Sequence, residues 1–282
     1  MVYERREILP PGTVVQHALH KVFAIDALIS RLPLHDTYKC HSVPGKESCA
    51  LRLTHDSSDE ALRQLNRLMR LELNSPRIER KIGVVRAPSW LGLITEWIDG
   101  WLLPGGQRVV KLRSFPEELA KLHAVRIAVE ILEGLQAFHR AGVIHGRLSP
   151  DSVSFREDGS IALVLAEAGV AEKEASSRIS FGSIDYTAPV SSAPRPTAKK
   201  DLALVAELLL WMLSGKSHTM GAPATMTQLG QTALLGLSAR QVVPALTTGI
   251  AVAIDRARSA GDCFASAAEM HLALCNAMKG NQ

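Results

Sequence analysis

The spacing of the apolar residues changes near residue 100, and this change constrains the fold more than any other feature of the chain. Before it, short apolar or alternating runs separated by turn-forming residues predict the strands of a small antiparallel sheet. After it, apolar residues recur at spacings of three and four, which predicts helices. A β-rich unit followed by a larger helical unit is typical of an α+β architecture.

The expected strands occupy residues 22–30, 37–42, 48–54, 81–86 and 91–98. An amphipathic helix is expected at 57–73, where three arginines share the polar face, Arg63, Arg67 and Arg70. Further helices are expected at 117–141, 202–213, 224–237, 239–257 and 264–278. The stretch 172–196 is rich in Ser, Ala and Pro and has no period, which indicates a long loop.

Composition excludes several classes of protein. Of the 282 residues, 46% are hydrophobic and 21% are charged, which fits neither a disordered chain nor a coiled coil. The formal net charge of +4 is too small to demand nucleic acid or an anionic membrane as partner. The four cysteines and ten histidines show no zinc-ligand spacing, so we expect no metal site and a reducing compartment. The charged start, and apolar stretches shorter than the ~20 residues that span a bilayer, lead us to expect a cytoplasmic protein.

The segment 138–153 reads Phe-His-Arg-Ala-Gly-Val-Ile-His-Gly-Arg-Leu-Ser-Pro-Asp-Ser-Val. It resembles the catalytic loop of protein kinases, whose pattern is H-R-D-L-x-x-x-N. Asp201 resembles the Asp that opens the family's central helix. Four more segments resemble parts of the family in the family's own order: 50–52 the third strand with its lysine, 95–98 the gatekeeper and hinge, 182–189 the end of the activation segment, and 262–270 the closing helix of bacterial Hanks-type Ser/Thr kinases.

This resemblance covers nearly the whole chain, from about residue 11 to 275. It implies a bilobal protein-kinase-like fold of the α+β class, with a β-rich N-lobe that holds one helix and a mainly α-helical C-lobe. The expected division is an N-lobe at residues 1–97 and a C-lobe at 98–282, which together form one domain.

The positions that handle nucleotide, metal and proton in this family carry other residues here. Arg52 replaces the phosphate-binding lysine, and the helix position that should supply its Glu partner falls near Asn66, so this cation is expected to have no acid. Arg147 replaces the Asp that accepts the hydroxyl proton, and a guanidinium is no base near neutral pH. Leu165 replaces a metal-binding Asp, and an aliphatic side chain offers no oxygen ligand. Two serines replace the loop Lys and the metal-binding Asn, Ser149 and Ser152.

We therefore expect a pseudokinase that is not an enzyme and that acts as a protein-binding scaffold or an allosteric regulator in signalling. Neither ATP with magnesium nor any other cofactor is expected to bind. The alternative is an atypical nucleotide-binding transferase in which Arg52 and Glu167 replace the usual Lys and Asp, with Glu96 and Ile98 of the hinge beside the nucleotide. A third and weaker interpretation is a nucleic-acid binder that uses the basic N-lobe, and we expect no nucleic-acid partner.

The expected partner is another protein, such as an active kinase or a phosphopeptide-binding regulator. The arginine face, formed by Arg63, Arg67 and Arg70, is a candidate docking surface for an acidic or phosphorylated partner, although a solvated helix face is the more common explanation. Hydroxyl residues in the long loop are candidates for phosphorylation, but a polar loop is the favoured interpretation: Ser176, Ser177, Ser180, Ser183 and Thr187.

Overall fold

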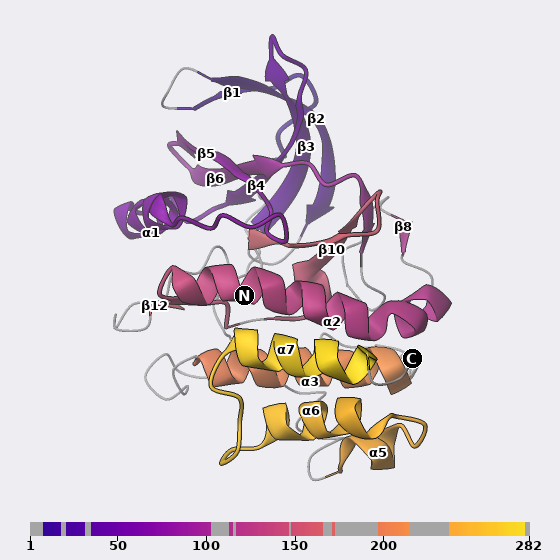
Figure 1. Cartoon of the computed structure of the whole chain (residues 1–282). Helices are drawn as coiled ribbons and strands as arrows, with labels where there is room; N and C mark the ends of the chain where they lie inside the picture. Colours follow the sequence, from indigo (N-terminus) through magenta and orange to yellow (C-terminus); the bar gives the residue numbers. More distant parts are fainter. Residues whose placement is uncertain are drawn as a thin grey trace, which may run out of the picture.

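The computed structural model describes residues 8–17, 21–31, 35–102, 113–114, 117–146, 148–165, 171–172, 197–214 and 237–279. These residues form two lobes, a sheet with one helix above a stack of helices (Figure 1). Among the described residues, no helix is long and apolar enough to cross a membrane.

The N-terminal lobe is an antiparallel sheet of six strands in the order β1-β2-β3-β4-β6-β5. The strands are β1 (Val14–Gln16), β2 (Val22–Arg31), β3 (His35–Val43), β4 (Ser48–Thr54), β5 (Lys81–Ala87) and β6 (Trp90–Glu96). Side chains alternate between the two faces, as in any strand. On β4, Cys49, Leu51 and Leu53 join the core on the outer face, while Ala50 and Arg52 line a cavity between the lobes.

Helix α1 (Asp59–Arg70) lies against β5 and β6 (Figure 1). Side chains bind the free backbone groups at both of its ends. Ser58 caps the first turn, because its hydroxyl accepts a hydrogen bond from the Ala61 backbone N–H. At the other end the Lys81 ammonium donates to carbonyls of the last turn, those of Leu68, Met69 and Leu71. Burial lowers the pKa of Lys81.

The C-terminal lobe is built from α2 (Glu117–Arg140), α3 (Ala198–Ser214), α5 (Ala239–Val242), α6 (Thr248–Arg258) and α7 (Ala267–Lys279). Helix α2 packs on α3 and α7, and α6 closes the bottom of the stack (Figure 1). Where the lobes meet, β10 (Val153–Arg156) pairs with β11 (Ile161–Leu163) and β7 (Gly100–Leu102), and β8 (Arg113–Ser114) runs parallel to β7. The remaining short elements are β9 (Val143–Ile144), η1 (Pro150–Ser152) and β12 (Ala171–Glu172).

One apolar core runs from the C-terminal helices into the N-terminal lobe. Leu65 and Leu68 of α1 and Leu91 and Leu93 of β6 belong to the same cluster as the buried faces of α2 and α3. The two lobes are therefore held together by packing as well as by the connecting chain.

The structure differs from the sequence in one expected helix and does not describe another. The single helix expected at 239–257 is wrong: α5 ends at Val242 and α6 begins at Thr248. Pro244 lies in the break, and a proline has no N–H to donate within a helix. The helix expected at 224–237 lies almost wholly outside the described residues.

Candidate functional site

A small cavity lies between the two lobes. Its roof comes from β2, β3 and β4, its back from the hinge segment that follows β6, and its floor from Ser154 of β10. Its volume is about 20 Å³, close to the space that one water molecule needs. The lining residues are Ile29, Ser30, Thr37, Ala50, Arg52, Glu79, Glu96, Trp97, Ile98 and Ser154.

Arg52 and Glu79 form a buried ion pair in this cavity. The Arg52 Nη2 atom lies 2.7 Å from Glu79 Oε1, and the two side chains are 4% and 1% exposed. Arg52 Nη1 also donates to the hydroxyl of Thr95 at 2.6 Å, and that hydroxyl donates to Glu79 Oε1 at 2.9 Å. Each of the three side chains thus contacts the other two, and the Thr95 hydroxyl binds both charged groups.

The second oxygen of Glu79 binds the C-terminal lobe. Oε2 accepts a hydrogen bond of 3.0 Å from the backbone N–H of Leu165, two residues after the end of β11. The Glu79 backbone N–H donates to the carbonyl of Leu163 at 3.0 Å. The Glu79 carboxylate therefore connects β4, β6 and the segment after β11, which holds Leu165.

The structure corrects the expectation that Arg52 has no acidic partner. The position expected for such a partner lies on the helix, near Asn66, which is not an acid. Asn66 is exposed on α1 and does not line the cavity. The acid comes from the segment between α1 and β5 instead. The only sequence signal for Glu79 is an isolated acid beside the apolar Ile78 just before a strand, and such a signal is too general to identify a partner.

The hinge carries a second ion pair between segments of the two lobes. Glu96 Oε1 lies 2.7 Å from Arg156 Nη2 of β10 and accepts the Arg80 backbone N–H at 3.0 Å. Burial alone would raise the pKa of Glu96, but the hydrogen bonds from Arg156 and from the Arg80 backbone outweigh burial and lower it. Ile98 also lines the cavity, so the structure places both expected hinge residues, Glu96 and Ile98, at this site.

Asp201 anchors the segment that resembles the catalytic loop. Its fully buried carboxylate accepts the backbone N–H of His145 at 3.0 Å and that of Gly146 at 2.7 Å. His139 Nε2 lies 2.8 Å from the same carboxylate. No pattern in the sequence indicates this contact, because the two residues are 62 positions apart in the chain.

Gly146 stands at the arginine position of the family's loop, and its backbone explains the residue type. Its φ is 75°, in the left-handed region that glycine adopts without strain. Ser149 and Ser152, the replaced loop positions, contact one another: the Ser149 backbone N–H donates to Ser152 Oγ at 3.1 Å, and the hydroxyl oxygens are 3.2 Å apart. These two hydroxyls thus bond to each other across η1.

Several expected site residues lie outside the part of the chain that the structure describes. They are Arg147, Glu167 and the loop hydroxyls Ser176, Ser177, Ser180, Ser183 and Thr187. The described ranges contain no group of three or more His, Cys, Asp or Glu side chains placed to hold a metal ion.

The arginine face is no part of the interlobe cavity. Arg63 and Arg70 are exposed and Arg67 is half-buried, and none of the three lines the cavity. Arg63 pairs with Glu60 one turn earlier at 2.9 Å, a contact between exposed groups that contributes little to stability. At the start of the helix Asp59 pairs with Arg86 of β5.

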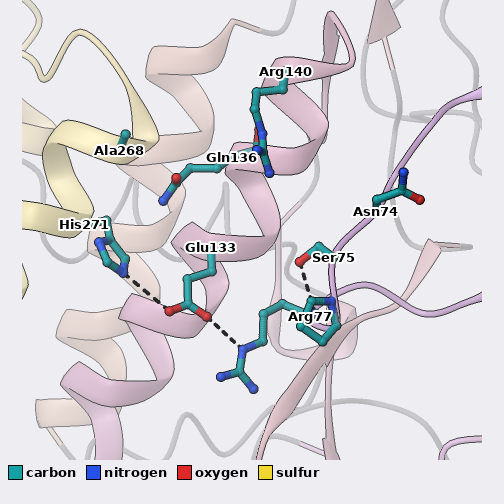
Figure 2. Close-up of a pocket in the computed structure, with 9 residues that line it drawn as sticks. Asn74, Ser75, Arg77, Glu133, Gln136, Arg140, Ala268 and His271 are labelled. Atoms are coloured by element: carbon teal, nitrogen blue, oxygen red, sulfur yellow. Dashed lines mark hydrogen bonds and ion pairs between the residues drawn. The ribbon is translucent and has the colours of Figure 1, made fainter.

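A second hollow of about 310 Å³ lies between the segment after α1 and the helices α2 and α7 (Figure 2). Glu133 of α2 is at its centre. One carboxylate oxygen lies 2.9 Å from Arg77 Nε and the other lies 3.5 Å from His271 Nε2 of α7. Figure 2 shows Arg77, Glu133 and His271 in a row across the hollow, with Arg140 and Gln136 farther along α2. These contacts join three segments of the chain, and none of these residues lines the interlobe cavity.

Comparisons with known proteins agree with this geometry. No protein-family model matches the chain. Curated relatives include the dual specificity testis-specific protein kinase 1 of Rattus norvegicus, 34% identical over 141 residues that cover 49% of this chain and 21% of that protein. They also include the probable serine/threonine-protein kinase pknA2 of Bifidobacterium longum, 31% identical over 96 residues that cover 33% of this chain and 13% of that protein. The chain therefore spans about a fifth or less of the length of these relatives.

Solved structures resemble the chain over almost its full length. The kinase domain of PknI from Mycobacterium tuberculosis aligns with a TM-score of 0.65 at 17% identity, covering 96% of this chain and 100% of that domain. Vaccinia related kinase 3 aligns with a TM-score of 0.66 at 13% identity, covering 98% and 93%. The chain has the bilobal α+β protein-kinase-like fold, as its sequence predicted.

The comparisons contradict one sequence-based expectation. We expected the chain not to be an enzyme, but its relatives are named as serine/threonine and dual specificity protein kinases. Replaced motif residues alone therefore do not establish that the chain lacks activity.

Proposed function

We propose that this chain is a kinase-like signalling domain that acts by binding another protein, and that its interlobe site is held by its own ion pair instead of by a nucleotide. The observation that carries the proposal is the position of Glu79. Its carboxylate contacts Arg52, Thr95 and the backbone of Leu165, and it does so inside a cavity of only about 20 Å³.

The charges in the cavity argue against a triphosphate there. A phosphate would have to compete for the Arg52 guanidinium with two groups that already bind it, the Thr95 hydroxyl at Nη1 and the Glu79 carboxylate at Nη2. The Glu79 carboxylate would in addition repel an incoming phosphate in a region screened from water. The volume is also far below the roughly 300–1,000 Å³ of typical small-molecule sites.

The position of Glu79 outside helix α1 leaves this helix available for a partner. Because Glu79 comes from the segment after α1, the helix α1 supplies no charged group to the cavity. The outer face of α1 can therefore contact another protein without disturbing the ion pair. The arginine face on this surface suits an acidic or phosphorylated partner.

A second candidate function is phosphotransfer by an atypical nucleotide-binding kinase, as the names of the relatives suggest. One observation of the cavity favours it. The Ser30 hydroxyl, the Thr37 hydroxyl and the Trp97 indole N–H are buried without a hydrogen-bond partner among the described residues, and all three residues line the cavity. A ligand between the lobes could satisfy them.

Thermal unfolding with nucleotides separates the two candidates. The unfolding temperature of the protein is measured without nucleotide and with ATP or ADP at millimolar concentration. Each nucleotide is added with magnesium, with manganese and without metal. We expect no change in the unfolding temperature, because the site is filled by Arg52 and Glu79. A nucleotide at about 100 times its dissociation constant would stabilise the fold by ~2.7 kcal/mol, and a rise of that order would favour the second candidate.

Two variants show whether such a rise comes from this cavity. Ser30→Ala removes one unpartnered hydroxyl and should reduce a rise that depends on the interlobe site. Asn66→Ala changes an exposed residue of α1 and should leave it unchanged. Transfer of labelled phosphate from ATP to the protein itself or to a generic substrate would support the kinase candidate directly.

The protein-binding part of the proposal predicts a charge-dependent contact. The triple variant Arg63→Glu, Arg67→Glu and Arg70→Glu reverses the charge of the arginine face. It should no longer be cross-linked to a partner protein that the native chain binds in a one-to-one complex. Lys199→Glu, an exposed charge reversal on α3, is the matched control and should leave the contact intact. Equal capture by the triple variant would show that this face is not the docking surface.

A further inference from the structure

Two cysteines lie directly opposite each other in the sheet of the N-terminal lobe. Cys40 of β3 and Cys49 of β4 are register partners in the antiparallel ladder. Opposite residues in such a ladder have Cα atoms about 4.5–5.5 Å apart, inside the ~4.4–6.8 Å range of disulfide-bonded cysteines. Both side chains also belong to the same apolar cluster, so they project from the same face of the sheet.

The two thiols already interact. A hydrogen bond to the Cys49 thiol, together with burial, raises the pKa of Cys40. The same hydrogen bond, with Cys40 as donor, outweighs burial and lowers the pKa of Cys49. Cys49 is therefore the thiol that ionises more readily. The Cys40 thiol lies beside it and donates to the Cys49 backbone carbonyl at 3.5 Å, while the Cys49 thiol donates to the Glu47 carbonyl at 3.4 Å.

We propose that Cys40 and Cys49 are a redox-active pair that a peroxide converts into an intramolecular disulfide across β3 and β4. The Cys49 thiolate attacks one peroxide oxygen, breaks the O–O bond and becomes a sulfenic acid. The other oxygen leaves as hydroxide and takes up the proton that Cys49 released when it ionised, which gives water. The Cys40 sulfur then attacks the Cys49 sulfur, and the hydroxyl leaves as a second water with the Cys40 proton. The two cysteines lose two electrons to the peroxide, and a dithiol can reverse the step by exchange.

Both cysteines are buried, at 0% and 1% exposed, but they lie beside the end of the hairpin, so a small oxidant reaches them when that end opens. Residues 43–48 form the exposed tip of the hairpin between the two strands, and Cys49 follows them directly. Fraying at the end of a hairpin costs little free energy, since few contacts are lost there. The disulfide would also lie next to Ala50, which lines the interlobe cavity, so it would link the strand that carries Arg52 covalently to β3.

The other two cysteines provide an internal control. The four cysteines of the chain are free, but Cys263 donates to the Ala257 carbonyl, and Cys275 contacts His271 on its own helix. A variant with Cys263→Ala and Cys275→Ala keeps only the proposed pair. Its two thiols can be counted in denaturant before and after treatment with hydrogen peroxide.

In this variant we expect the thiol count to fall from two to none and the intact mass of the monomer to fall by about 2 Da, the loss of two hydrogens. A peptide map should contain one cross-linked species that joins Cys40 to Cys49, and dithiothreitol should restore both thiols. Retention of both thiols, stepwise gain of oxygen on single cysteines, or covalent dimers would overturn the proposal. Single variants Cys40→Ala and Cys49→Ala should each prevent the cross-link, and the native chain should fall from four thiols to two.

Discussion

The variant Glu79→Gln is expected to lower the free energy of unfolding by about 3–5 kcal/mol, because it leaves the buried guanidinium of Arg52 without its counter-charge. Glutamine has the size of glutamate and can still accept the Leu165 backbone N–H, so packing changes little. Arg52→Met should cost a similar amount, since the carboxylate is then the uncompensated buried charge. Chemical denaturation with urea measures both differences.

The double variant Arg52→Met with Glu79→Gln tests this explanation. With neither charge present, no buried ion is left unpaired, and the stability should return to within ~1–2 kcal/mol of the native chain. The two single losses would then be strongly non-additive, as expected for groups in direct contact. Additive losses, or a single-variant cost below about 1 kcal/mol, would show that the two charges do not stabilise each other in the cavity.

The second large effect is expected at Asp201. Asp201→Ala removes the acceptor of two backbone N–H groups, at His145 and Gly146, and the contact with His139. Each buried donor left without a partner costs about 1–3 kcal/mol, so we expect a loss of ~3–5 kcal/mol or failure to fold. Urea denaturation measures the loss, and the yield of folded protein reports the extreme case.

Two further variants keep this expectation testable. Asp201→Asn preserves the shape but turns one acceptor oxygen into a donor, so it should fold and still lose more than about 1 kcal/mol. Lys199→Ala, an exposed change on the same helix, should stay within about 0.5 kcal/mol of the native chain. Equal stability of Asp201→Asn and the native chain would contradict the anchoring role.

The sequence predicted the overall fold because its information there is local. The strand at 48–54 agrees with β4, and the helix expected at 117–141 agrees with α2, which ends just before Gly142. Period and turn residues act over a few positions, so they can be read without tertiary structure. The single error among the described helices, at 239–257, was also local, since Pro244 was visible in the sequence.

The sequence alone also located the loop at His145 and its anchor Asp201, because both lie in segments with a recognisable order. It could not identify the groups that meet from distant parts of the chain. Glu79 reaches Arg52 only because β4 and β6 are neighbours and the segment before β5 crosses their end. Cys40 faces Cys49 only in the register that the β3–β4 hairpin adopts. If the register shifted by one residue, the side chains of one strand would move to the opposite face of the sheet. Strand register and the meeting of distant segments are set by packing of the whole domain, so only the tertiary structure decided them.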